Sequence, residues 1–401
     1  MKKIVSIIKY LINIPIYLLS KIIKPNENIW IFGAWFGDKY ADNSKYLFEY
    51  VNRNCHNIKA IWLSNDSNTV KLVKKKGYKS YKTYSLMGYF YSIFAKYGFV
   101  STGMFDINFI PTYNMKLINL WHGIPLKKIV MDDFITRVIP KDNLYNKLKN
   151  FLFPFLQDNR YYSVIATSDD INKIYQSAFK GLTKRVDTIG QTRCDAFYIP
   201  VAETEFTKKL NLIKQKGKKI GIYMPTHRRE GKIDFSKFLI DELDNLNNEL
   251  ISNNVILLIK LHYYHQKDIN KLQKDYSNII FIKDNDIEQD IYSILSLTDF
   301  LITDYSSIYF DYLHSNKPII FFAFDKDDYL KNDRAFYFEY DEVTPGEKAY
   351  NWSELYKKMK LIVNNNDSYI EQRKIINDRF NQYQDGHNCE RVVEWIKSLE
   401  R

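Results

Sequence analysis

The chain has 401 residues, of which 45% are hydrophobic, and it carries a formal net charge of +11. This length exceeds what one compact core normally supports, so two domains are expected, and the hydrophobic content excludes an intrinsically disordered chain. The positive charge favours anionic partners, such as phospholipid headgroups or a phosphate-rich substrate. Nucleic acid is disfavoured because the sequence has no zinc-finger spacing, ribonucleoprotein motif or heptad zipper. The three cysteines form no CxxC pair and are typical of reduced thiols in a cytosolic protein.

Residues 1–27 are predicted to form an amphipathic helix on a membrane surface. Their apolar run is interrupted by Lys9, Asn13 and Lys21 and lacks a small-residue cleavage site, which disfavours both a bilayer-spanning helix and a cleaved signal peptide. The polar residues recur mostly at helical spacing and leave a broad apolar face. We therefore expect this helix to lie on an anionic membrane. The alternative is a helix that packs its apolar face on its own domain.

Short apolar runs alternate with longer helical segments along the rest of the chain. Six strands are expected in the first half, at 28–33, 58–64, 97–102, 116–123, 162–168 and 186–191. Five follow in the second half, at 219–226, 255–262, 279–284, 299–307 and 318–324. This alternation is typical of βαβ units and of parallel sheets, so the fold class is α/β.

The polar stretch at 200–219 separates the two sets of strands and marks the expected domain boundary. It predicts two Rossmann-like domains that face each other across a cleft, at 28–205 and 206–375. The tail is helical and polar, and residues 376–401 are expected to form a C-terminal helix that packs back on the N-terminal domain.

Polar side chains follow the carboxyl ends of five expected strands, where open parallel sheets bind ligands. Several are cationic or carry hydroxyl groups, so together they predict a phosphate-lined cleft. Two groups have a plainer interpretation: Ser306 and Ser307 could serve only as helix caps, and His262 alone could be an ordinary loop histidine. The candidates are His122, Gly123, Gly190, Thr192, Arg193, Asp195, Thr226, His227, Arg228, Arg229, Lys260, His262, Thr303, Asp304, Ser306 and Ser307.

Other reaction chemistries lack their motifs. The sequence contains no GxxxxGK[ST], GxGxxG, HExxH or GxSxG pattern. The Asp-x-Asp strings at 284–286 and 325–327 match a metal-binding tripeptide of some glycosyltransferases, but such tripeptides are common in a charged chain. We therefore expect no metal and no cofactor, with cationic and neutral donors stabilising a leaving phosphate.

Eight strings resemble, in order, the motif series of the CDP-glycerol glycerophosphotransferase family, the bacterial teichoic-acid primases and polymerases. The strings are LWHGIPLKK, GQTRCD, YMPTHRR, IKLHYY, FLITDYSSIYFDYL, KPIIFFAFDKDDY, RAFYFEYDEVTPG and YQDGHNCERVVEWI. The resemblance implies a GT-B-like fold and a peripheral location on the cytoplasmic face of the bacterial cell membrane. It further implies transfer of glycerol phosphate, or a related alditol phosphate, from a CDP donor to a lipid-linked glycan acceptor, with release of CMP.

The resemblance also implies roles for individual residues. His122 would be the general base, and an unperturbed histidine pKa near 6.5 suits that role. His262 would be the second catalytic residue. Substrate would be bound by Gly123, Ile124, Arg193, Thr226, Arg228, Lys260, Thr303, Asp304, Ser306, Ser307 and Asp311.

Two strings depart from the family pattern. Pro-Arg-Asn-Asp is replaced by Thr192-Arg193-Cys194-Asp195, and Pro-Thr-Trp-Arg by Pro225-Thr226-His227-Arg228, so the charged residues are kept. The substitution of a histidine for a tryptophan leaves the donor open between CDP-glycerol and CDP-ribitol. Primase, polymerase and capsule enzyme also stay open.

Two other functions fit part of the pattern. A GT-B glycosyltransferase that uses a nucleotide sugar would share the fold, the cleft and the basic surface, but it would not need the motif strings. A catalytically silent membrane-surface protein that binds a polyanion would need the N-terminal helix and the charge, but not His122 or His262.

Overall fold

The computed structural model describes residues 13–135, 144–153, 155, 161–226, 235–261, 274–288, 290–326, 328–329 and 335–399. The chain divides into two compact units. Unit 1 consists of Met1–His122, Ile129–Asp195 and Asp385–Arg401, and unit 2 of Gly123–Lys128 and Ala196–Gln384. The sequence-based boundaries lie instead at 205/206 and 375/376, and the predicted arrangement of the domains across a cleft stays a prediction.

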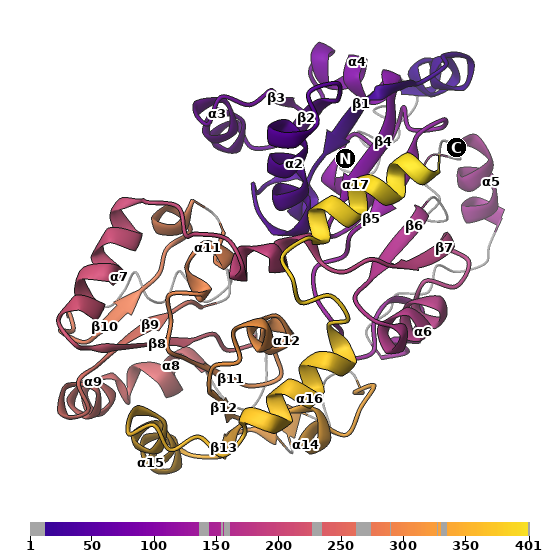
Figure 1. The fold of residues 1–401 in the computed structure, drawn as a ribbon. Helices are drawn as coiled ribbons and strands as arrows, with labels where there is room; N and C mark the ends of the chain where they lie inside the picture. The colour runs from indigo at the N-terminus through magenta and orange to yellow at the C-terminus, as the bar shows by residue number, and fades with distance from the viewer. Residues whose placement is uncertain are drawn as a thin grey trace. The chain divides into compact units, whose positions relative to one another are not determined.

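Unit 1 is built on a seven-stranded parallel sheet in the order β3-β2-β1-β4-β5-β6-β7 (Figure 1). The strand order reverses between β1 and β4, and ligands of open α/β sheets bind beside the strand ends at such a reversal. The strands are β1 (Asn26–Phe32), β2 (Lys59–Ser64), β3 (Ser80–Lys82), β4 (Ala95–Val100), β5 (Lys116–Asn119), β6 (Tyr161–Ala166) and β7 (Thr183–Thr188).

Helices surround this sheet, and their starts follow local capping chemistry. The Asp66 carboxylate accepts the Thr69 amide at 2.7 Å at the start of α3, and Ser168 caps α6 in the same way. The helices are α2 (Asp42–Asn54), α3 (Ser67–Lys75), α4 (Leu86–Phe94), α5 (Leu144–Leu152), α6 (Asp169–Ala178) and α17 (Asn388–Ser398). Short 3-10 turns lie at η1 (Trp35–Gly37), η2 (Met104–Asp106), η3 (Val130–Asp132) and η5 (Thr192–Phe197).

Unit 2 repeats the design with a six-stranded parallel sheet in the order β10-β9-β8-β11-β12-β13. Its order reverses between β8 and β11. The strands are β8 (Lys219–Tyr223), β9 (Val255–Ile259), β10 (Ile279–Phe281), β11 (Phe300–Thr303), β12 (Ile319–Phe322) and β13 (Glu347–Ala349). The helices are α7 (Glu205–Gln215), α8 (Phe235–Ile240), α9 (Leu243–Ser252), η7 (Asp284–Ile287), α11 (Tyr292–Leu295), α12 (Ile308–Tyr312), η8 (Leu313–Ser315), α14 (Tyr340–Val343), α15 (Trp352–Val363) and α16 (Ile370–Phe380).

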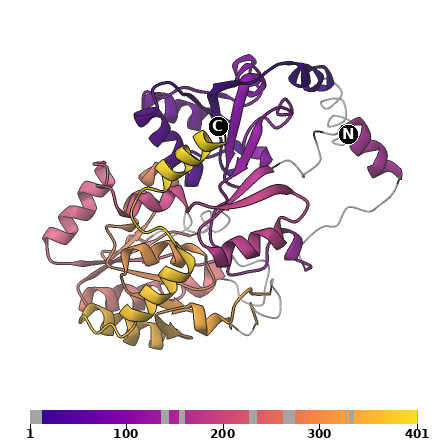
Figure 2. The same cartoon turned by 45° about the vertical axis from the view of Figure 1, so that its right-hand side comes forward.

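The last helix of the chain, α17, belongs to unit 1, where it packs against α2 (Figure 2). The Asp195 carboxylate accepts the Asn388 and Cys389 amides at 2.9 and 2.8 Å at the start of α17. Burial raises the pKa of Asp195, although these hydrogen bonds oppose the shift. The contact therefore ties the C-terminal helix to the 3-10 turn η5.

Residues 13–22 are helical and pack partly on unit 1. Tyr17 lies in the apolar core of the unit, and Asn13 accepts a hydrogen bond from the Tyr89 hydroxyl of α4 at 2.7 Å. Leu18, Leu19 and Ile22 are exposed instead. Residues 1–12 lie outside the described part of the chain, so the amphipathic membrane helix of residues 1–27 stays a prediction. None of the helices in the described part is long and apolar enough to cross a membrane.

All eleven expected strands overlap observed strands, and the α/β class with two parallel sheets is confirmed. Two short edge strands, β3 and β13, were not predicted. Each has only three residues, and neither Ser80-Tyr81-Lys82 nor Glu347-Lys348-Ala349 is an apolar run. Their pairing therefore comes from the neighbouring strand rather than from their own sequence.

Candidate functional site

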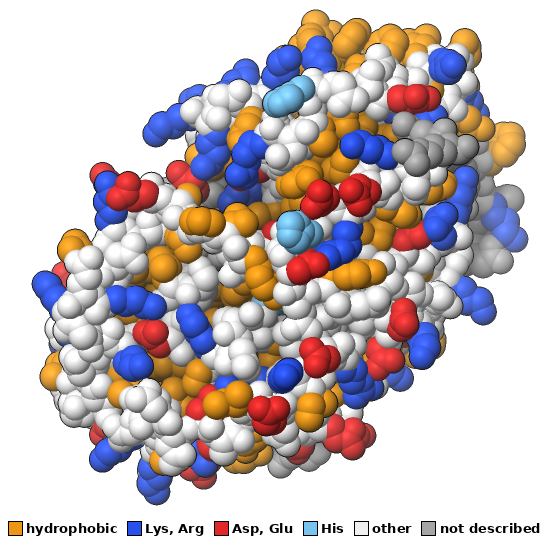
Figure 3. All heavy atoms as spheres, viewed as in Figure 1, with side chains coloured by type: hydrophobic (Ala, Val, Ile, Leu, Met, Phe, Trp, Pro, Cys, Tyr) orange, Lys and Arg blue, Asp and Glu red, His pale blue; other side chains and the backbone are white. Residues whose placement is uncertain are grey.

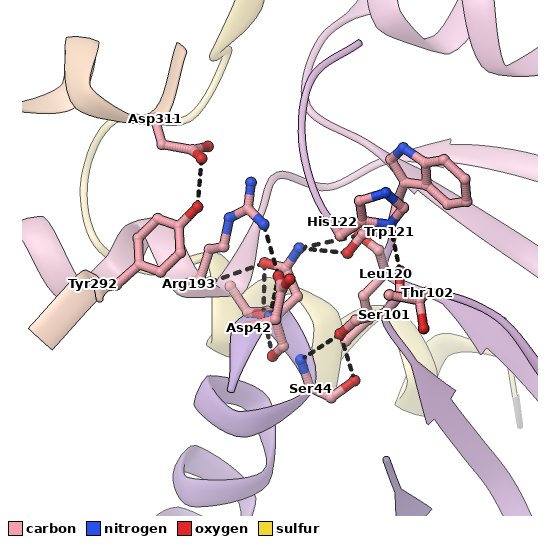
Figure 4. A network of polar contacts seen from close by, with 12 residues as sticks. Asp42, Ser44, Ser101, Thr102, Leu120, Trp121, His122, Arg193, Tyr292 and Asp311 are labelled. Atoms are coloured by element: carbon pink, nitrogen blue, oxygen red, sulfur yellow. Dashed lines mark hydrogen bonds and ion pairs between the residues drawn. The ribbon is translucent and has the colours of Figure 1, made fainter. Parts of the chain in front are cut away.

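His122 lies just beyond the carboxyl end of β5, in unit 1. Its Nδ1 is 3.1 Å from the Ser101 carbonyl oxygen, which can only accept a hydrogen bond (Figure 4). Nδ1 therefore carries the proton, and whenever the ring is neutral its proton acceptor is Nε2. The ring packs against Trp121 at 4.2 Å and against Trp35 at 5.9 Å between centroids. This tautomer is the one that a general base requires.

The loop that holds His122 is itself held by Asp106, which is completely buried. The Asp106 carboxylate accepts the Ser101 and Thr102 amides at 2.8 and 2.7 Å, and it also accepts the Phe36 amide at 2.7 Å. Complete burial raises the pKa of Asp106, and the hydrogen bonds from Thr102, Phe36 and Ser101 oppose that shift. One carboxylate thus joins the loop after β4 to the loop after β1.

A second network fixes the backbone immediately before His122. Trp121 has a φ of +55°, in the left-handed region that disfavours bulky residues. The Asn43 side-chain nitrogen Nδ2 donates to the Trp121 carbonyl at 2.8 Å. The Arg193 backbone amide donates to the Asn43 side-chain oxygen Oδ1 at 3.0 Å. The Arg193 guanidinium pairs with Asp42 at 2.7 Å, with 2% and 4% of the two side chains exposed (Figure 4).

In unit 2, Thr226 and Asp304 meet at the reversal of the strand order. Thr226 follows β8, and Asp304 follows β11. The Asp304 carboxylate accepts the Thr226 amide at 2.9 Å, the Thr226 hydroxyl at 2.6 Å and the Tyr305 amide at 2.6 Å. Asp304 is fully buried, so in the structure it orders the two loops at the sheet edge.

Lys260 lies at the same sheet edge, directly after β9, the strand next to β8. Its ammonium group pairs with Asp284 at 2.5 Å. The Thr303 hydroxyl donates to the Met224 carbonyl at 2.8 Å, which links β11 to the end of β8. The strand ends therefore gather Lys260, Thr226, Thr303 and Asp304 along one edge of unit 2, as the sequence predicts.

The remaining candidates are more scattered. Ser306 and Ser307 are half-buried before α12, and the Ser307 side chain makes no cap hydrogen bond there. Asp311 is buried in α12 and accepts the Tyr292 hydroxyl at 2.7 Å. Gly123 and Ile124 directly follow His122 but belong to unit 2, where Ile124 is fully buried.

Four of the candidates, His227, Arg228, Arg229 and His262, lie outside the described part of the chain. Across the described residues, no group of three or more His, Cys, Asp or Glu side chains is arranged to hold a metal ion. Of the two Asp-x-Asp strings, Asp284 is paired with Lys260, and Asp325 accepts a hydrogen bond from the Tyr305 hydroxyl at 3.1 Å.

Sequence reasoning did not find Asp106, Asn43 or Asp42. The available signal for Asp106 was its place in a Ser-Thr-Gly-rich turn directly after an expected strand. The candidates were instead chosen at strand ends whose strings carry histidine, arginine or the Thr-Asp-x-Ser-Ser pattern, and the turn at Asp106 has none of these. For Asn43 and Asp42 the sequence carries no such signal, because their partners Trp121 and Arg193 lie far away along the chain.

Comparison with known proteins identifies the family. The sequence profile of CDP-glycerol:poly(glycerophosphate) glycerophosphotransferases matches residues 16–398. The chain belongs to this family. The predicted family and the predicted class of enzyme are thereby confirmed.

The following relatives are similar to this chain over nearly their whole length. The teichoic acid glycerol-phosphate transferase of Staphylococcus aureus is 28% identical over 97% of this chain and 98% of its own. The teichoic acid poly(glycerol phosphate) polymerase of Bacillus spizizenii is 27% identical over 94% of each chain. The solved structure of the wall teichoic acid polymerase TagF matches with a TM-score of 0.77 and 26% identity, covering 99% of this chain and 95% of that one.

Proposed function

We propose that this protein transfers glycerol phosphate from CDP-glycerol to a hydroxyl group of a lipid-linked glycan during teichoic acid synthesis. The observation that carries the proposal is the His122 tautomer, with Nδ1 bonded to the Ser101 carbonyl at the carboxyl end of a parallel strand. Membership of the glycerophosphotransferase family and the presence of two parallel sheets agree with it. Family relatives named as ribitol-phosphate polymerases make CDP-ribitol the competing donor.

His122 would act as the general base of this reaction. Nε2 takes the proton of the acceptor hydroxyl as that oxygen attacks the β-phosphorus of the donor. A bond forms between the acceptor oxygen and the β-phosphorus, and the bond from that phosphorus to the bridging oxygen breaks. CMP leaves with the bridging oxygen on its phosphate. The glycerol phosphate is then joined to the acceptor by a phosphodiester.

Unit 2 would hold the donor. Its strand ends supply the Lys260 ammonium group beside the Thr226 and Asp304 loops, at the reversal of strand order where nucleotides bind in α/β sheets. Cationic and hydroxyl groups there neutralise charge on the phosphoryl oxygens and on the leaving CMP. Arg228, His262, Ser306, Ser307 and Asp311 are proposed to complete this site. No metal ion is required by this scheme.

The reaction class is tested by measuring CMP release with CDP-glycerol, CDP-ribitol and a UDP-sugar, each with a lipid-linked disaccharide acceptor. CMP is expected from CDP-glycerol, and addition of EDTA should leave the rate unchanged. CMP from CDP-ribitol alone would reassign the donor. Formation of UDP from the sugar, with neither CDP-alditol consumed, would replace the proposal by a glycosyltransferase.

We further propose that unit 1 docks on the anionic cytoplasmic face of the membrane through an apolar surface. The surface is formed by the helix of residues 13–22 and by α4, which the Tyr89–Asn13 hydrogen bond joins. Figure 3 shows hydrophobic side chains gathered along the upper edge of the molecule, over the region where α4 is labelled in Figure 1. The exposed members are Leu18, Leu19, Ile22, Leu86, Met87 and Phe90.

Substituting Ile22 and Leu86 by aspartate is expected to weaken binding to anionic phosphatidylglycerol vesicles by at least about tenfold. These side chains are 82% and 90% exposed, so the substitutions remove apolar area from the lipid contact without opening the core. Deleting the helix would be less informative, because Tyr17 is part of the core. The matched control is Ile375→Asp in α16 of unit 2, which is 63% exposed. In a sedimentation assay, equal vesicle binding by the Ile22→Asp/Leu86→Asp variant and by the Ile375→Asp control would refute the docking surface.

A further inference from the structure

The turn η1, directly after β1, exposes large aromatic side chains in a strained backbone. Trp35, Phe36 and Gly37 have consecutive φ angles of +50°, +58° and +80°. For residues other than glycine this region costs about 1–3 kcal/mol each, and it persists only where the surroundings impose it. The Phe36 side chain is 58% exposed, and Trp35 is half-buried.

Several hydrogen bonds impose this conformation. Asp106 accepts the Phe36 amide at 2.7 Å, and the Asn65 side chain donates to the Phe36 carbonyl at 2.8 Å. The Gly37 carbonyl accepts both the Asn65 amide and the Ser64 hydroxyl at 2.6 Å. These hydrogen bonds thus hold two aromatic residues at the surface, where their side chains gain less from the hydrophobic effect than they would in the core.

The turn lies beside the proposed base, His122. It follows β1, and the loop that carries Ser101 follows β4, so both stand at the reversal of strand order in unit 1. The Trp35 and His122 rings are 5.9 Å apart between centroids. A hydroxyl that donates its proton to His122 Nε2 must come within about 3 Å of that atom. The Trp35 ring is therefore close enough to the proposed base to contact the rest of an acceptor unit bound on that side of His122.

We propose that Trp35 and Phe36 form the acceptor-binding platform, and that the unit they take is a saccharide ring. The C–H face of a pyranose carries partial positive charge and is apolar, so it complements the negative face of an aromatic ring. A terminal glycerol phosphate is small and anionic, and it would gain little from two aromatic faces. This assignment rests on the proposed function, because it takes His122 as the base.

Asp106 connects the aromatic platform rigidly to the proposed base, His122. The same carboxylate accepts the Phe36 amide on one side and the Ser101 amide on the other. Because the Ser101 carbonyl fixes the His122 ring, the distance between platform and base is set by a single buried group. A saccharide hydroxyl is therefore presented to Nε2 by a rigid surface rather than by a mobile loop.

The test compares Trp35→Ala and Phe36→Ala with wild type in steady-state CMP release, using two acceptors. One is a short-chain lipid-linked disaccharide, and the other is the same lipid ending in glycerol phosphate. Each variant is expected to raise KM for the disaccharide by about tenfold or more, with kcat and KM for CDP-glycerol within about twofold of wild type. Trp35→Phe should recover part of the loss. Phe151→Ala in α5, at a side chain 80% exposed, is the control and should change nothing.

Other outcomes overturn the platform. A fall in kcat with unchanged acceptor KM would mean that Trp35 only orients His122, and equal losses with both acceptors would refute the saccharide preference. If Trp35→Ala does not fold, the exposed Phe36→Ala carries the test. Calorimetric titration of the disaccharide without donor separates the two proposals. If wild type binds the disaccharide but releases no CMP, the proposed function is refuted and the platform stands. If both variants bind the disaccharide with the dissociation constant of wild type, the platform alone is refuted.

Discussion

Replacing His122 by alanine is expected to lower kcat by about two to four orders of magnitude, the usual contribution of a general base. The variant loses the ring whose Nε2 is the proposed proton acceptor, because Ser101 holds the proton on Nδ1. Binding of CDP-glycerol should be unchanged, since the donor is assigned to unit 2. Single-turnover CMP release and calorimetric donor binding measure the two quantities separately.

The matched control is His56→Ala, which removes an exposed histidine from the same unit. It should retain full turnover. Unchanged turnover in the His122 variant would contradict the assignment. A parallel loss of donor affinity would instead make His122 a donor ligand, and the base would then have to be sought elsewhere.

The parallel sheets were predictable because their strands are short apolar runs between helical segments. β9, Val255–Ile259, is buried along its whole length, as a central parallel strand must be. The strand ends then follow by topology, which is why Lys260, Thr226 and Asp304 were found at one edge of unit 2. The positions of polar residues just after strands therefore carry real information about a site.

The groups that fix the geometry were harder to foresee. Asp106 acts mainly through backbone amides, those of Phe36, Ser101 and Thr102 among them, and a backbone amide leaves no trace in the sequence. The positive φ angles of Trp35 and Trp121 oppose local preference, and only tertiary contacts impose them. Arg193 is a further residue whose surroundings the sequence does not reveal. Its charge suggested a substrate contact, but in the structure it pairs with Asp42, which is 151 positions away along the chain.

Substituting Arg193 by alanine is expected to destabilise unit 1 by about 3–5 kcal/mol, the usual cost of removing one partner from a buried ion pair. The Asp42 carboxylate, whose side chain is 4% exposed, would stay buried without its cationic partner. It would keep the hydrogen bond from the Asn43 backbone amide at 2.7 Å. The cavity left by the guanidinium adds to the loss. Hydrogen exchange of α2 under increasing urea reports this unit separately from unit 2.

The double variant Asp42→Asn with Arg193→Met should recover most of that stability, because it leaves no unpaired charge in the interior. Asparagine suits position 42, where φ is +67°, since it adopts the left-handed region more readily than most residues. If Arg193→Ala instead keeps its stability and raises KM for CDP-glycerol tenfold, the guanidinium contacts the donor, as the family resemblance implies. Stability loss without a specific donor effect places Arg193 among the residues that hold Trp121, and through it His122, in position.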